Sequence, residues 1–235
     1  GDLLGRTQNE SELVYCVSLV EQLLTTGGGW QDQAGCLPGG FKINRSIGSL
    51  PLEVSVNVVD LPARFIRLFE QRSFLVYTGV PRLARNILII ALRSFSLMPL
   101  SPGTAGGTTG SLIKEAEAST AALQAYALAN KDENNKEGNA EADEAALQEL
   151  AKNLSRYWQL KTRMAVGSEP VHIANLLASL RPYCCGLSIC GAGAGGYAIC
   201  VLHKDAFVGQ NAQEGLAKLV DDIDPLLSVH SLGQI

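Results

Sequence analysis

The sequence predicts an α+β protein, and two observations lead to that prediction. Long stretches place apolar residues at helical spacing, whereas short β-branched or aromatic runs bounded by glycine or proline are typical of strands. In the last third of the chain, strand, strand, helix and strand follow two or more helices. This order favours a small antiparallel sheet with several helices.

Each expected element follows from its local pattern. The segments with strand composition are 41–43, 52–58, 74–77, 186–190, 197–202 and 226–232. The segments with helical spacing are 11–24, 65–69, 82–95, 112–130, 140–164, 171–180 and 211–220. Residues 99–110 have loop composition, and the charged, Asn-rich segment 131–139 is expected to be a mobile loop.

Composition excludes several classes of protein. The chain has 235 residues, of which 46% are hydrophobic, and a net charge of −4, which argues against a nucleic-acid partner. No stretch approaches the roughly 20 apolar residues of a membrane span. The six cysteines show no paired C-x-x-C spacing and are expected to be buried thiols in a reducing cytoplasm. The start at Gly1, without Met, predicts a beginning inside a larger polypeptide.

Two carboxylates stand out around one glycine run, Gly27-Gly28-Gly29. Glu21 lies four residues after Val17, so it shares the apolar stripe of the first helix and needs a partner there. Asp32 follows the glycines on a turn where it could accept a proton. The alternatives are a Glu at the edge of the stripe that reaches solvent and an ordinary glycine turn with a solvated Asp.

A second glycine loop, Gly191–Gly196, matches the G-x-G-x-x-G pattern on paper. A dinucleotide site needs a helix after that loop, but the strand-like run 197–202 follows, so the dinucleotide interpretation fails. A glycine loop between two strands still offers backbone N–H groups to an anion or a substrate. The alternative is a tight hairpin.

Together these features resemble the superfamily of galactokinase, homoserine kinase, mevalonate kinase and phosphomevalonate kinase (GHMP kinases), and within it the fucokinases. The resemblance covers most of the chain apart from the segment near 99–145. It is carried by four stretches: Leu24-Thr25-Thr26-Gly27-Gly28-Gly29-Trp30-Gln31-Asp32-Gln33, Leu75–Gly79 with Arg82–Leu88, Tyr157-Trp158, and Gly191–Gly196.

The resemblance implies a role for each matching position. Asp32 matches the catalytic base that takes the proton of the anomeric hydroxyl of the sugar, and Glu21 matches an acidic Mg²⁺ ligand. Phosphoryl transfer from ATP needs mainly such positioning and charge neutralisation. The remaining matches are substrate-binding Gly28, Gly29, Trp30, Tyr77 and Arg82, and the loop glycines Gly193, Gly195 and Gly196, which close the site.

Two departures qualify the resemblance. Ala194 stands where relatives carry glycine, and its methyl group puts tight closure of the loop in doubt. The Pro-x-Gly-x-Gly-Ser-Ser motif that wraps the ATP phosphates does not occur in the printed residues. We therefore expect residues 1–79 to complete an N-terminal kinase lobe and residues 80–235 to form the C-terminal lobe. The chain alone is expected to be inactive.

The resemblance thus predicts a cytoplasmic kinase that converts L-fucose and ATP to L-fucose 1-phosphate in a salvage route to GDP-fucose. Two alternatives stay open. One is a non-catalytic relative that binds or regulates, favoured by Ala194 and the missing motif and opposed by Glu21 and Asp32. The other is a kinase for another hexose or a heptose, because Trp30 and Tyr77 do not distinguish these sugars.

Overall fold

The computed structural model describes residues 10–23, 29–36, 39–47, 52–81, 87, 89–90, 105–130 and 139–232. The chain divides into a first unit, residues 1–61, and a second unit, residues 62–235. Within the described ranges no helix is both long and apolar enough to cross a membrane.

The first unit contains two helices and one hairpin. Helix α1 (Glu10–Leu23) is followed by the short helix α2 (Gln31–Cys36), and strands β1 (Lys42–Ser46) and β2 (Val54–Val58) pair antiparallel. Its core is small: among the described residues Val14 of α1, Ala34 of α2 and Val54 of β2 are buried together, and Trp30, Leu52 and Val56 pack against them. The two helices and strand β2 thus meet at a single cluster.

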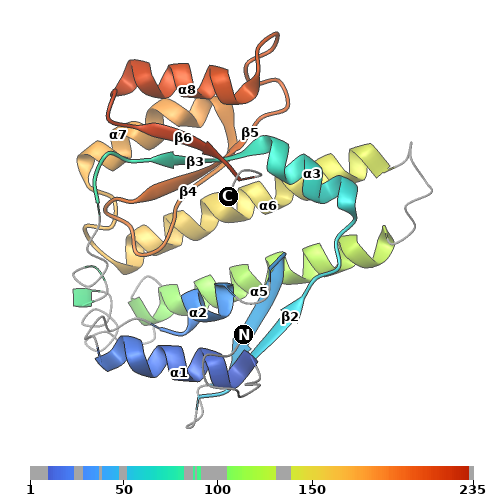
Figure 1. Cartoon of the computed structure of the whole chain (residues 1–235), viewed down its shortest axis with the longest axis vertical. Helices are drawn as coiled ribbons and strands as arrows, with labels where there is room; N and C mark the ends of the chain where they lie inside the picture. The colour runs from blue at the N-terminus through green and yellow to red at the C-terminus, as the bar shows by residue number, and fades with distance from the viewer. Residues whose placement is uncertain are drawn as a thin grey trace, which may run out of the picture. The chain divides into compact units, whose positions relative to one another are not determined.

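The second unit is larger and is built around one sheet (Figure 1). Its elements are α3 (Ala63–Arg72), β3 (Ser73–Tyr77), α5 (Ala105–Ala129), α6 (Asn139–Met164), α7 (Val171–Leu180), the 3-10 turn η1 (Arg181–Tyr183), β4 (Cys184–Ile189), β5 (Tyr197–Leu202), α8 (Ala212–Ile223) and β6 (Ser228–Ser231). The strand order is β4-β5-β3-β6, and every pair is antiparallel. Strand β3, which precedes the long helices in sequence, therefore lies in the middle of the sheet.

One face of this sheet forms the main core of the unit. Side chains alternate between the two faces of a strand, so Phe74 and Val76 of β3 point the same way. They are buried with Leu177 of α7 and Leu216 of α8. Asn211 caps the start of helix α8, because its side chain accepts hydrogen bonds from the backbone N–H groups of Gln213 and Glu214 in the first turn.

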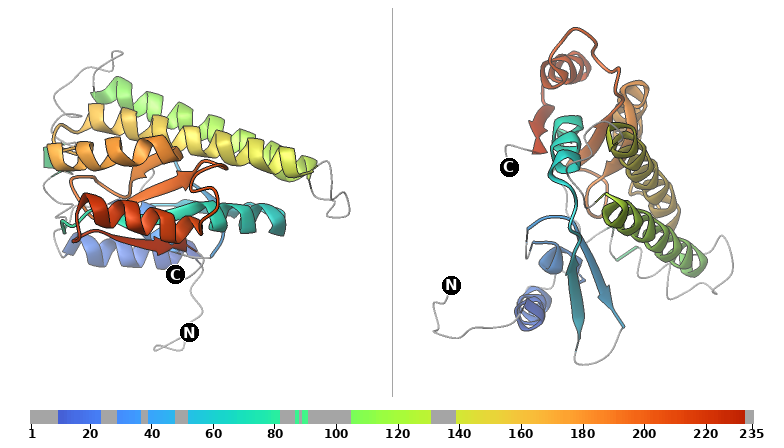
Figure 2. Two further views of the ribbon diagram at one scale, coloured as in Figure 1. Left: turned by 90° about the horizontal axis from the view of Figure 1, so that it is seen from above. Right: turned by 90° about the vertical axis from the view of Figure 1, so that its right-hand side faces the viewer.

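Helix α6 lies against the edge strand β4, and α5 packs beside α6 (Figure 2). Gly186 of β4 makes this close approach feasible, because a Cβ atom there would lie 2.6 Å from the backbone of Ala151. One turn further on, the Ser155 hydroxyl accepts a hydrogen bond of 3.1 Å from the Leu187 N–H. Helix α6 thereby covers the edge strand β4 and supplies a hydrogen-bond partner for one of its backbone N–H groups.

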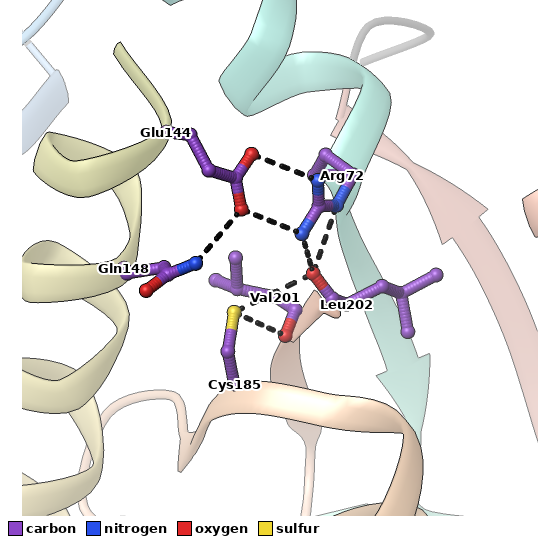
Figure 3. Close-up of polar contacts among 6 residues, drawn as sticks. All are labelled: Arg72, Glu144, Gln148, Cys185, Val201 and Leu202. Carbon is purple, nitrogen blue, oxygen red and sulfur yellow. Dashed lines mark hydrogen bonds and ion pairs between the residues drawn. The ribbon is translucent and has the colours of Figure 1, made fainter. Parts of the chain in front are cut away.

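A partly buried arginine ties three elements together (Figure 3). Arg72, the last residue of α3, forms an ion pair of 3.2 Å with Glu144 of α6 and donates a hydrogen bond of 2.8 Å from Nε to the Leu202 carbonyl of β5. Its side chain is only 12% exposed. Beside it, the Cys185 thiol lies 3.3 Å from the Val201 carbonyl. Burial is the main cause that raises the pKa of this thiol.

The predicted α+β architecture is confirmed, including the strand–strand–helix–strand order at the end of the chain. The loop predicted over 99–110 is wrong from Ala105 onward, where α5 begins. Its glycines disfavour a helix by about 1 kcal/mol each. Packing outweighs this, since Thr108 is buried and α5 lies side by side with α6 (Figure 1).

Other expectations meet the structure in part. Cys16 and Cys36 are exposed, so the expectation of buried thiols is wrong for these two residues. Most of the expected helix 82–95 and nearly all of the expected mobile loop 131–139 lie outside the described residues; Asn139 begins α6. The boundary between the two units lies at 61/62, whereas the boundary between kinase lobes was expected at 79/80. The expected lobes are those of a longer kinase, so the lobe boundary stays a prediction.

Candidate active site

Asp32 lies in the first turn of α2, three residues after Gly29, the described end of the glycine run. Its side chain is exposed and lines a pocket of about 320 Å³ in the first unit. The pocket is otherwise lined by Leu13, Val14, Val17, Gln33 and Cys36. An exposed carboxylate in the lining of a mostly apolar pocket can meet a proton donor there, while the apolar side chains limit water on one side.

Glu21 lies in the last turn of α1 and is joined to α2 by Gln33. The Gln33 side-chain amide donates a hydrogen bond from Nε2 to Glu21 Oε2 across twelve residues of sequence. Glu21 therefore has the partner that its position on the apolar stripe requires. This contact brings the Glu21 carboxylate beside the residue that follows Asp32.

The other end of the same amide is unsatisfied. Gln33 Oε1 is buried and has no hydrogen-bond partner among the described residues. A buried polar atom without a partner is costly and often marks a place for a water or an ion. Gln33 Oε1 and the Glu21 carboxylate belong to two hydrogen-bonded side chains, and both are hard oxygen donors of the kind that Mg²⁺ takes together with several waters.

Gln33 is the residue that the sequence analysis missed. It belongs to the Thr-Gly-Gly-Gly-Trp-Gln-Asp-Gln string, so its position was visible, but nothing in the spacing showed that it reaches Glu21. Twelve residues with a glycine break between them do not place two side chains on one helix face. The contact depends on how α1 and α2 pack, which is a tertiary property.

The predicted substrate-binding residues of the first unit fall in different environments. Gly29 is exposed, and a Cβ there would collide only with the flexible Gln31 side chain, so packing alone does not demand glycine. Trp30 is half-buried and packs against the small core. Gly28 and Arg82 lie outside the described residues.

In the second unit, the predicted loop Gly191–Gly196 does connect β4 to β5 and contacts the segment after β3. The Thr78 backbone N–H and hydroxyl donate to the Gly196 carbonyl at 2.9 and 3.0 Å, and the Gly196 N–H donates to Val80 at 2.9 Å. Tyr77, the last residue of β3, is therefore held next to the end of the loop. Tyr77 is half-buried and pairs with Tyr197 across the strands.

Gly193 is a position where only glycine fits. Its φ is +96°, and a Cβ atom would lie 2.6 Å from the carbonyl oxygen of Ser168. The next residue, Ala194, donates its N–H to that same carbonyl at 2.6 Å and has φ of +62°. An alanine in this left-handed region is strained by about 1–2 kcal/mol. The departure noted in the sequence therefore has a conformational consequence.

The chain is similar in sequence to two curated enzymes. It is 28% identical over 202 residues to the bifunctional fucokinase/GDP-fucose pyrophosphorylase of Arabidopsis thaliana, and 26% identical over 198 residues to the L-fucokinase/L-fucose-1-P guanylyltransferase of Bacteroides fragilis. These matches cover 86% and 83% of this chain but only 17% and 18% of the relatives. No protein-family profile matches the chain.

Solved structures match the fold. The galactokinase of Lactococcus lactis complexed with galactose aligns with a TM-score of 0.55 at 16% identity, over 97% of this chain and 60% of that protein. The mevalonate kinase of L. major in complex with R-mevalonate aligns with a TM-score of 0.56 at 14% identity, over 94% and 56%. The chain has the fold of the GHMP kinases. Its predicted resemblance to the fucokinases is confirmed.

Proposed function

We propose that this chain is the part of an ATP-dependent sugar kinase that carries the catalytic base, and that the sugar is L-fucose. The observation that carries the proposal is the Gln33 bridge, which holds Glu21 beside the helix that presents Asp32. The similarity to two proteins named as fucokinases supports the choice of sugar. The product would be L-fucose 1-phosphate, for use in GDP-fucose salvage in the cytoplasm.

Asp32 acts in this proposal as the general base. Its exposed carboxylate accepts the proton of the anomeric hydroxyl while that oxygen bonds to the γ-phosphorus of ATP and the bond to the leaving ADP oxygen breaks. General-base assistance of this kind contributes roughly 10²- to 10⁴-fold to a rate.

Glu21 and Gln33 would hold Mg²⁺, which supplies charge neutralisation on the phosphates when bound. The donor set fits that ion, because Mg²⁺ takes one or two protein oxygens and keeps waters for the rest. Gln33 has a second task in this arrangement: its N–H fixes the orientation of the Glu21 carboxylate. No group of three or more His, Cys, Asp or Glu residues that could form a denser site occurs within the described part of the chain.

Asp32→Asn tests the proposed base in a polypeptide that joins this chain to an upstream phosphate-binding motif. We expect the rate of L-fucose 1-phosphate formation to fall by roughly 10²- to 10⁴-fold, with the unfolding midpoint unchanged, because the side chain is exposed. Asp60→Asn is the matched control, since Asp60 is an exposed aspartate of the same unit outside the pocket. A rate for Asp32→Asn equal to that of the control would assign the base elsewhere.

A binding or regulatory role is the second candidate, and Ala194 favours it. The strained Ala194 and the absence of a Pro-x-Gly-x-Gly-Ser-Ser motif from the printed sequence are unfavourable for catalysis by these residues alone. We therefore expect the 235-residue chain by itself to show no turnover with L-fucose and Mg·ATP. Turnover by the isolated chain would remove both the regulatory alternative and the need for an added phosphate motif.

A further inference from the structure

Three ring side chains form a continuous patch on the second unit, here named the aromatic platform: Tyr77, Tyr197 and His230. The ring centroids of Tyr77 and Tyr197 lie 5.3 Å apart, and those of Tyr197 and His230 lie 5.9 Å apart in an edge-on arrangement. Tyr197 is 40% exposed, and His230 is also exposed. Half-exposed rings in mutual contact offer both apolar surface and polar tips.

The platform lies on the face of the sheet opposite the main core. Tyr77 is paired with Tyr197 in the register of β3 and β5, and Leu75 is paired with His230 in the register of β3 and β6. Residues two apart on a strand share a face, so Tyr77 and Leu75 point away from Val76, which is fully buried in the core. The rings therefore do not take part in the packing against α7 and α8.

The platform is also next to the glycine loop. Tyr197 directly follows Gly196, and Tyr77 directly precedes Thr78, which donates two hydrogen bonds to the Gly196 carbonyl. The loop connection and the segment after β3 therefore fix both tyrosines at one end of the sheet. The Ser228 hydroxyl lies 3.0 Å from His230 Nε2 and adds a polar group beside the rings.

We propose that the aromatic platform binds the sugar, with Tyr197 stacking on the apolar face of L-fucose that carries its C6 methyl group. This inference rests on the proposed function for the identity of the sugar and adds Tyr197 and His230 as binding residues. The platform residues include no Lys, Arg, Asp or Glu, which suits an uncharged ligand. Ring faces contact C–H groups, while the tyrosine hydroxyls and the Ser228–His230 pair can bond sugar hydroxyls.

The proposal predicts a preference between two sugars that differ at one atom. L-Galactose has the configuration of L-fucose but carries a hydroxyl on C6. Placing that hydroxyl against a ring removes water from it without supplying a partner, which is unfavourable. An apolar surface rejects an added hydroxyl only modestly, so we expect L-fucose to bind about 3- to 10-fold more tightly than L-galactose.

Sugar binding by the 235-residue chain itself tests the platform, because the measurement needs no ATP. L-Fucose is titrated into the chain, and saturation transfer from protein protons to the C6 methyl protons is recorded by NMR, with L-galactose as the comparison sugar. Tyr197→Ala should raise the dissociation constant for L-fucose by roughly 5- to 10-fold, equivalent to the loss of one aromatic contact. It should also bring the two sugars closer to equal affinity. Tyr197→Phe, which keeps the ring, should stay within about twofold of the unsubstituted chain for L-fucose.

Each outcome decides the proposal. A selective loss in Tyr197→Ala, with the unfolding midpoint retained, supports the platform. An unchanged dissociation constant in Tyr197→Ala, or no transfer of saturation to the methyl group in the unsubstituted chain, overturns it. The proposed kinase function is judged separately by phosphate transfer. If L-fucose binds through Tyr197 but the extended polypeptide transfers no phosphate to it, the proposed kinase function is wrong and the proposed binding by the platform is still supported.

Discussion

The two units of this chain divide stability and proposed chemistry between them. In the first unit only three described residues form the buried centre of the core, and the proposed base and metal ligand lie on the helices around it. In the second unit fifteen buried residues form one cluster between a four-stranded sheet and its helices. The comparison sets a unit with a small buried core, which carries the proposed base and metal ligand, against a unit with a much larger buried core.

This difference has a physical reason. Burying apolar area is the main favourable term in folding, so the unit with more buried side chains can tolerate strain such as that at Ala194. Charged side chains are rarely buried in a core. In the first unit the proposed base Asp32 is exposed, and the proposed metal ligand Glu21 is half-buried and hydrogen-bonded to Gln33.

The largest expected effect distinguishes the two cores directly. Leu177→Ala in the second unit should lower its free energy of unfolding by about 3 kcal/mol, because Leu177 is almost completely buried. Val54→Ala in the first unit removes fewer buried atoms and should lower that unit's free energy of unfolding by about 2 kcal/mol.

The two tryptophans make this comparison measurable. Trp30 reports on the first unit and Trp158, which is 3% exposed, on the second. Urea unfolding followed by fluorescence in Trp30→Phe and Trp158→Phe backgrounds separates the transitions. We expect the Trp158 transition at the higher urea concentration. The reverse order would contradict the assignment of stability to the second unit.

A smaller effect is expected at the ion pair of Figure 3. Arg72→Met should destabilise the second unit by about 2 kcal/mol, because it leaves the Leu202 carbonyl and the partly buried Glu144 carboxylate without their shared donor. Urea unfolding that monitors Trp158 measures the change.

Arg156→Met is the control for that substitution. Arg156 forms ion pairs with Glu115 and Glu149, but its side chain is 53% exposed, so the expected loss is at most about 1 kcal/mol. If Arg72→Met and Arg156→Met lower the free energy of unfolding equally, burial of the Arg72 ion pair does not contribute to the stability of the second unit.

The smallest expected effect has the opposite sign. Ala194→Gly should stabilise the second unit by about 1 kcal/mol, since glycine adopts a φ of +62° without strain. Ala192→Gly in the same loop is the matched control: Ala192 is also half-buried but is not among the residues with positive φ. It should destabilise by about 0.5 kcal/mol through the added freedom of the unfolded chain. If both substitutions stabilise the second unit, backbone strain at Ala194 is not the reason for the effect of Ala194→Gly.

Sequence patterns were sufficient for the parts of the fold that depend on local order. The helix over 171–180 and the strand over 197–202 were predicted with the bounds that the structure has, because each combines a clear period with flanking Pro or Gly. The start of α5 was not predicted, because Gly106, Gly107 and Gly110 suggested a loop. Packing against α6 outweighs the low helix propensity of these glycines. The central place of β3 in the sheet was also missed, since strand order is set by contacts between distant segments.

The candidate site shows the same limit. Asp32 and Glu21 were proposed from a motif, and their roles stay predictions. The contact that links them depends on Gln33, whose reach to Glu21 follows from the packing of α1 on α2. The aromatic platform joins Tyr77, Tyr197 and His230 from three strands that are far apart in sequence. A single sequence does not show which strands become neighbours.

The central claim is that Asp32 serves a kinase that phosphorylates L-fucose at its anomeric oxygen. The most direct measurement is the transfer of labelled γ-phosphate from Mg·ATP to L-fucose by the polypeptide that joins this chain to its phosphate-binding motif, with the product examined by ³¹P–¹H NMR. We predict that phosphorus couples to the anomeric proton and that Asp32→Asn slows the appearance of this signal by roughly 10²- to 10⁴-fold. Phosphate on another hydroxyl, or no transfer to L-fucose, would contradict the account.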